Sequence, residues 1–467
     1  MAQVKFFLSM KEKEIKVKEI SKNMFNMFML FTKSPNINFF CEELEYYSNE
    51  DNSIIGVVLL DLTDKNFNYV MLVRDEHKQF RAVDVKIDFE AKQEAAEQLK
   101  NSIKWHTGQN LKEVKQNVSR KGIELFKILV SRDKIHPYFT RLDKDEQLIP
   151  SKKAIIEIAH HFHDIDKNFV EQLQSINGFD ARLWELYLFT AFTEQKFLIQ
   201  RTYERPDFII EKFDIKIGVE AVTLGRDKHN PPSYIFYEKQ IPNTQQIADK
   251  IKNEAPLRYG SALYSKLSKK YWSLPHLINK PFLISVADFH DNASMTWSYT
   301  SLIEYLYGQR EVVTFSKDGA PLLKTEEVGP YTKASGTKIN SGFFYQKDTE
   351  NLSGVLFSTT GTISKFTRMG IQAGFRSKNQ LVLRVGEKYD PNSNAFASIP
   401  FSYYVDETCN ESWSEGLHLF HNPLAKHPID IELFPDIAHH KLEDKRLLSW
   451  TPSFVPFSSI NINIIFR

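Results

Sequence analysis

Two acidic residues on the arms of an expected hairpin carry the clearest chemical signal in the chain. In segment 205–222, apolar and β-branched residues run toward and away from a short polar tip, which is typical of two antiparallel strands joined by a tight turn. If the turn is centred between Phe213 and Asp214, Asp207 pairs with Glu220 and both carboxylates point to the same face of the sheet. Because like charges in such a pair repel, the pattern predicts a cation between them, most simply a divalent metal ion.

A third acid lies in the preceding expected helix. Apolar residues recur at three- and four-residue spacing in segment 178–192, with Glu185 in its middle. A glutamate is rarely buried without a charged partner or a bound ion. Carboxylates of this kind suit Mg²⁺, or Mn²⁺, since these ions take oxygen ligands and Mg²⁺ keeps several waters. We therefore expect Asp207, Glu220 and Glu185 as metal ligands.

The order of these motifs resembles the PD-(D/E)XK superfamily of nucleases, which have the restriction-endonuclease-like fold. The matching residues are Glu185 on the helix, the Pro206-Asp207 pair at the start of the hairpin and Glu220 on its return strand. The resemblance covers about 177–288. It implies an α/β (α+β overall) fold with a mixed sheet flanked by helices, and a metal-dependent nuclease that hydrolyses phosphodiester bonds of DNA or RNA.

One position departs from the family pattern, because Val222 stands where the family usually has a lysine. Some members use residues of the helix that follows, and the expected helix 257–271 carries Lys266 and Lys270 at i, i+4 spacing, with Tyr271 beside them. We rank the two lysines as catalytic cations above Arg205, which would lie opposite Val222, because a lysine stem reaches further and its pKa is more easily tuned.

Composition places few limits on function. The chain has 467 residues, a formal net charge of +1 and two distant cysteines, Cys41 and Cys409, a pattern typical of a reducing compartment such as the cytoplasm. Because the chain is nearly neutral, binding of nucleic acid must depend on local patches of positive charge. We expect DNA as the partner more than RNA. Neither a signal peptide nor a membrane span is visible, and a homo-oligomer or a protein partner stays open. Fold-level analogy suggests bacterial restriction or anti-phage defence.

Two or three domains are expected from the chain length, and the sequence patterns divide it into two segments. Segment 1–150 contains strand patterns at 53–61, 68–73 and 81–89 followed by a helical pattern, and predicts an α+β accessory or recognition domain. Segment 151–467 would hold the nuclease domain, interrupted by a β-rich insertion at about 310–347.

Two further clusters attract attention. Segment 359–370 combines hydroxyl residues and glycines with Lys365 and Arg368, which suggests a surface for the phosphate backbone. His418, His421 and His427 lack a spacing known for metal ligands, so we expect no metal site from them.

Two alternatives compete with the nuclease. The first is a nucleic-acid-binding protein of the same fold that has lost cleavage, which Val222 makes credible. The second is a non-nuclease enzyme or interaction protein in which the acids form salt bridges, for instance to Arg182, Arg201 or Arg205.

Overall fold

The computed structural model describes residues 15–109, 122–164, 167–225, 243–291, 293–333, 335–392 and 397–466. It divides into two compact units, Met1–Lys121 and Gly122–Arg467. The boundary lies earlier than the expected position after residue 150. The reason is packing within the second unit, where α4 (Ile149–Ala159) lies so close to α10 (Ile363–Gln372) that a side chain at Gly370 would collide with the backbone of Pro150.

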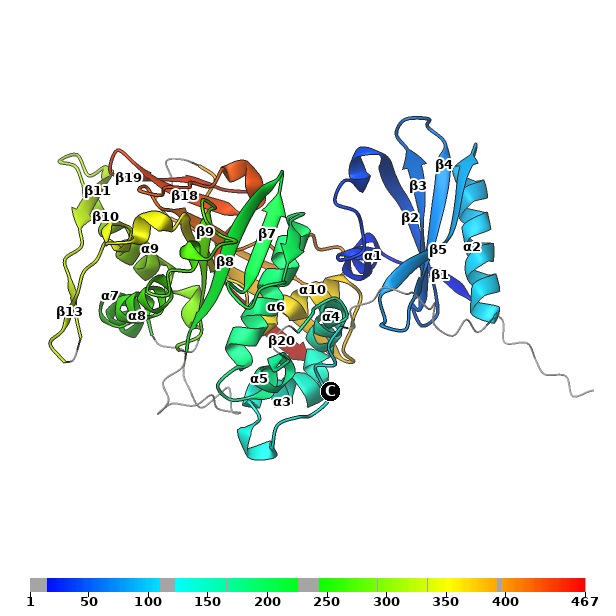
Figure 1. Cartoon of the computed structure of the whole chain (residues 1–467), viewed down its shortest axis with the longest axis horizontal. Coiled ribbons are helices and arrows are strands. Elements are labelled where there is room, and N and C mark those ends of the chain that lie inside the picture. Colours follow the sequence, from blue (N-terminus) through cyan, green and yellow to red (C-terminus); the bar gives the residue numbers. More distant parts are fainter. Residues whose placement is uncertain are drawn as a thin grey trace, which may run out of the picture. The chain divides into compact units, whose positions relative to one another are not determined.

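The first unit is an α+β unit, as the sequence predicted. Five antiparallel strands follow one another in chain order, and α2 (Lys92–Gly108) packs on one face of their sheet (Figure 1). The core on that face joins Val58, Tyr69 and Met71 of the sheet to Ala95 and Leu99 of the helix. The other elements are α1 (Lys22–Met29), β1 (Val17–Glu19), β2 (Cys41–Asn49), β3 (Ile54–Asp61), β4 (Phe67–Arg74) and β5 (Phe80–Phe89).

A mixed sheet of eight strands forms the centre of the second unit. Its order is β19-β18-β17-β14-β9-β8-β7-β6, with β8, β9 and β14 parallel neighbours and the β7–β8 pair antiparallel. The strands are β6 (Leu198–Gln200), β7 (Phe208–Lys212), β8 (Ile215–Leu224), β9 (Phe282–Asp288), β14 (Gly354–Ser358), β17 (Leu417–His421), β18 (Ala438–Glu443) and β19 (Arg446–Trp450).

Helices α6 (Phe179–Glu194) and α8 (Ala255–Leu267) cover opposite faces of this sheet. Neighbouring residues of β14 point to opposite faces. Ser358 donates a hydrogen bond of 3.3 Å to Tyr187 of α6, whereas the ring of Phe357 lies 6.3 Å from that of Tyr259 of α8. The further helices are α3 (Pro137–Lys144), α5 (Phe169–Gln174), α7 (Thr244–Asn253) and α9 (Tyr299–Tyr307). Within the described ranges, none of the helices combines the length and apolar character that crossing a membrane requires.

The expected β-rich insertion is confirmed. A hairpin of β10 (Gln309–Phe315) and β11 (Pro321–Glu327), and a short pair of β12 (Tyr331–Thr332) and β13 (Lys338–Ile339), stand between α9 and β14 and extend away from the main sheet (Figure 1). A separate three-stranded sheet contains β15 (Gln380–Lys388), β16 (Ile399–Tyr404) and β20 (Pro456–Ile465).

The predicted phosphate-binding surface at 359–370 is wrong. Lys365 and Arg368 lie on α10 and are buried, and both bind Glu411, with Lys365 Nζ and Arg368 Nε each 2.7 Å from its carboxylate oxygens. The hydroxyl of Thr359 donates to a backbone carbonyl at 2.8 Å. Both cations therefore form contacts inside the fold, because Glu411, which is distant in the sequence, supplies the negative charge that allows their burial.

Candidate active site

The β7–β8 hairpin has the predicted register. Phe208 pairs with Val219, so continuing the ladder by one residue places Asp207 opposite Glu220. Phe213 and Asp214 form the turn with φ of 52° and 61°, the left-handed conformation that a two-residue hairpin turn requires. The pairing of the two acids therefore follows from the local geometry of the hairpin.

Glu220 lies in a buried and negatively charged environment. Its side chain is nearly inaccessible, and Lys266 Nζ lies 2.6 Å from Oε1. Burial and then the negative charge of Asp207 raise the pKa of Glu220 to about 7, although Lys266 opposes the shift. Asp207 is fixed beside it, because its Oδ2 accepts a hydrogen bond of 2.7 Å from the backbone N–H of Ala221.

Tyr271 and Arg205 complete the cluster. Burial raises the pKa of the Tyr271 phenol, the charge of Glu220 adds to this shift, and Lys266 and Arg205 oppose it. For Lys266, burial acts to lower the pKa, but the carboxylates of Glu220 and Asp207 outweigh burial and raise it. We call Asp207, Glu220, Lys266, Tyr271 and Arg205 the acid site.

Lys270 takes a different place from Lys266. The sequence predicts a helix that continues to residue 271, but α8 ends at Leu267, and Lys270 has a left-handed backbone with φ of 52°. Its ammonium binds Asp348 at 2.9 Å. The end of the helix removes the shared face on which the sequence prediction depended.

Glu185 is buried on α6 among arginines. Its Oε1 lies 2.6 Å from Arg182 Nη1, and its Oε2 lies 3.7 Å from Arg201 Nη2. Glu220 faces α8 through Lys266, whereas α6 covers the opposite face of the sheet. This placement favours an ion pair that stabilises the fold over the metal-binding role that the sequence predicted for Glu185.

The position of Glu220 predicts a pH effect on stability. A folded-state pKa raised from 4.5 to about 7 gives a stabilising contribution that is complete below about pH 4.5 and is lost as the pH rises through about 7. Glu220→Gln should remove this loss, so relative to wild type the variant should gain about 3 kcal/mol of unfolding free energy between pH 4.5 and 7.5. Denaturant unfolding in EDTA across this range measures it, and parallel curves for the two proteins would contradict the assignment.

Two pairs of buried histidines join β17 to β18. The sequence pattern draws attention to His418 and His421 but not to their partners, His439 and His440. His418 Nδ1 lies 3.1 Å from His440 Nε2, and His421 Nε2 lies 3.0 Å from His439 Nδ1. Tyr299 bonds to His440 at 3.0 Å. Burial lowers the pKa of all four rings, to about 3 for His418 and His421, so they are neutral core residues. The partners His439 and His440 are adjacent on β18, and this His-His pair is the only local signal in the sequence.

The acid site offers two carboxylates to a metal ion. Among the residues that the structure describes, no group of three or more His, Cys, Asp or Glu side chains is arranged to hold a metal. Mg²⁺ is commonly held by one or two protein carboxylates while waters fill its other positions. The oxygens of Asp207 and Glu220 fit this limited ligand set.

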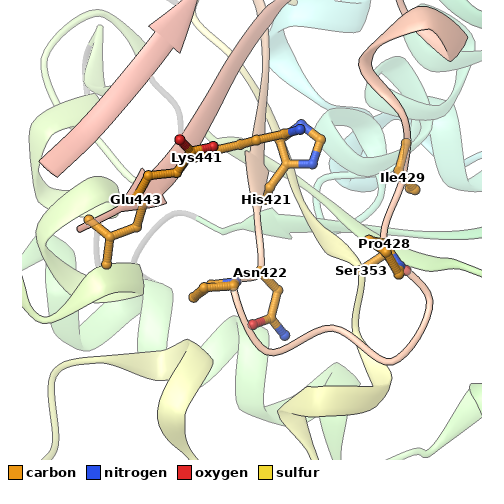
Figure 2. A pocket seen from close by; sticks show the side chains of 9 residues that line it. Ser353, His421, Asn422, Pro428, Ile429, Lys441 and Glu443 are labelled. Carbon is orange, nitrogen blue, oxygen red and sulfur yellow. The ribbon is translucent and has the colours of Figure 1, made fainter. Parts of the chain in front are cut away.

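A cavity of about 210 Å³ lies elsewhere, between β17, β18 and their loops (Figure 2). β9 and β14 separate these strands from β8 in the sheet. Asn422 donates to two backbone carbonyls there, at 2.7 and 2.8 Å, and Ser353 donates to a third. Lys441 and Glu443 also line the cavity. The amide and the hydroxyl hold the surrounding loops in place, so we assign no function to this cavity.

Comparison of the chain with protein-family models, with curated proteins and with solved structures finds no match. The interpretation of the acid site therefore depends on its own residues and geometry.

Proposed function

We propose that this protein is a metal-dependent nuclease of the restriction-endonuclease-like fold that hydrolyses phosphodiester bonds, with DNA as the preferred substrate over RNA. The observation that carries the proposal is the burial of Glu220 next to Asp207, with Lys266 bound to one of its oxygens. Two acids held together at a cost in free energy are typical of a functional site. A cytoplasmic role in restriction or anti-phage defence suits such an enzyme.

Asp207 and Glu220 would hold Mg²⁺ or Mn²⁺ at this site. When bound, a divalent ion lowers the pKa of a coordinated water and offsets negative charge on the phosphate. Ionised Glu220 is needed for binding, so protons and metal compete for it, because its pKa is raised to about 7.

Lys266 takes the place of the lysine that the family pattern would have at Val222. Its ammonium stays charged, because the carboxylates of Glu220 and Asp207 raise its pKa. A fixed positive charge at this position can stabilise the negative charge that develops on the phosphate oxygens. Tyr271, whose pKa is raised, remains a neutral phenol that can donate a hydrogen bond.

The direct test is incubation of the purified protein with duplex DNA, single-stranded DNA and RNA, each with Mg²⁺, Mn²⁺ or EDTA. Cleavage with metal and none with EDTA supports the proposal. Binding without cleavage, with affinity falling steeply as salt rises, would replace the enzyme by a nucleic-acid-binding protein of the same fold. If the protein neither binds nor cleaves nucleic acid, the result favours the interaction protein, in which the acids mainly form salt bridges such as those of Glu185.

Lys266 and Lys270 form a matched pair for a further prediction. Lys266→Ala should slow cleavage by about a hundredfold or more, which is the usual effect of removing one group that stabilises transition-state charge. Lys270→Ala should leave the rate near that of wild type, since Lys270 binds Asp348. Single-turnover rates at saturating metal separate the two variants. Equal losses in both would contradict the assignment of Lys266.

A further inference from the structure

An exposed aromatic stack lies beside the acid site. The rings of Tyr203 and His276 are 3.8 Å apart and nearly parallel, with an interplanar angle of 7°. Tyr203 remains 46% exposed although His276 covers part of its ring. A stack that served only to fill the core would be buried on both sides, so this ring presents open aromatic surface.

A hydrogen bond and two short chain connections place this stack near the acid site. His276 Nε2 lies 2.9 Å from the backbone oxygen of Arg205, which belongs to the acid site. His276 also follows Tyr271 closely along the chain, and Tyr203 precedes Asp207 by four residues, a reach of at most about 14 Å. The open ring and the two carboxylates are therefore within the span of a few nucleotides.

The chemistry of this surface fits an unpaired nucleobase. A flat, exposed aromatic ring binds a base by stacking, and this contact tolerates any base because each has a π face. Paired bases inside a duplex are already stacked and do not offer such a face, so recognition of this kind targets single strands, loops and ends. Arg205, which is exposed and lies between Tyr203 and Asp207 along the chain, suits a backbone phosphate.

We propose that the Tyr203–His276 stack binds an unpaired base next to the phosphate that is cut, so that the substrate is a single strand or a single-stranded stretch. This inference rests on the proposed nuclease function for the identity of the substrate. Tyr203 anchors the base, and Arg205 holds the adjoining phosphate.

Binding in EDTA tests the stack independently of cleavage. Fluorescence anisotropy would compare a labelled 20-mer single strand, the same sequence as a blunt duplex, and a 20-mer with abasic sites throughout. We expect the single strand to bind about tenfold or more tightly than the abasic strand, since stacking on one aromatic side chain has roughly this effect. Tyr203→Leu should remove that advantage, and Tyr203→Phe should keep it.

Tyr404→Leu is the matched control, because Tyr404 is a tyrosine at least as exposed as Tyr203 and lies on β16, in a separate sheet. It should bind like wild type. The inference is overturned if wild type binds the abasic and normal strands equally, or if Tyr203→Leu, shown to be folded by its unfolding transition, keeps the full affinity. Base-dependent binding through Tyr203 without cleavage under Mg²⁺ or Mn²⁺ would instead refute the nuclease and leave the base site standing.

Discussion

Asp207→Ala and Glu220→Ala should each abolish metal-dependent cleavage. Each variant removes one of the two carboxylates that would hold the metal ion. Without the metal, the transition state loses several kcal/mol of stabilisation, which lowers the rate by about a thousandfold or more. Rates with Mg²⁺ and with Mn²⁺ measure the loss. Asp214→Ala is the matched control, since Asp214 lies on the same hairpin but at its exposed tip, and it should cut like wild type.

Thermal unfolding gives the same variants a second readout. Mg²⁺ should raise the melting temperature of wild type and of Asp214→Ala, but not of the two acid-site variants, because a ligand stabilises only the state that binds it. The wild-type shift should shrink as the pH falls below about 7, where Glu220 takes up a proton. Without metal, Glu220→Ala should be at least as stable as wild type at pH 8, since it relieves the repulsion with Asp207. An equal Mg²⁺ shift in all variants would place the metal elsewhere.

The local parts of the site could be predicted from the sequence. The hairpin register depends on alternation along a few residues and on a two-residue turn, so the sequence alone predicts the pairing of Asp207 with Glu220 that the structure has. The α+β class and the insertion follow from the same short-range patterns. The assignment to the restriction-endonuclease-like fold and the function stay proposals.

Contacts between distant segments set the limit of that prediction. The choice between Lys266 and Lys270 depends on the point where α8 ends, and helix ends are among the least predictable features. One partner of Glu185 is Arg201, which lies beyond the C-terminal end of α6. The sequence indicated that a buried glutamate needs a partner, but it could not say whether the partner is a metal ion or a guanidinium.

Segment 359–370 illustrates the same limit more strongly. Its lysine and arginine read as surface residues, because charged side chains are rarely buried. The acid that permits their burial, Glu411, lies more than forty residues further along the chain, and the third cation of the cluster, Arg384, comes from β15. No local pattern connects these segments.

Glu411→Gln should therefore be among the most destabilising single substitutions in the second unit. Glu411 contacts three buried cations, with Arg384 Nη1 at 3.4 Å in addition to Lys365 and Arg368. Burial acts to raise the pKa of Glu411, but the three cations outweigh it and lower the pKa. Glutamine cannot compensate these charges, and breaking a buried ion pair from one side costs about 3–5 kcal/mol of unfolding free energy.

Denaturant unfolding at neutral pH measures this loss, with Glu407→Gln as the matched control. Glu407 binds Arg376 at 2.8 Å on the surface, with side chains 37% and 67% exposed, so its loss should cost less than about 1 kcal/mol. The lowered pKa of Glu411 gives stability that is complete above the unfolded value of 4.5 and is lost as the pH falls below it. The free energies of unfolding of wild type and Glu411→Gln should therefore converge in acid. A Glu411→Gln variant as stable as Glu407→Gln would mean that the three cations are solvated, and would return segment 359–370 to the surface role that its composition suggests.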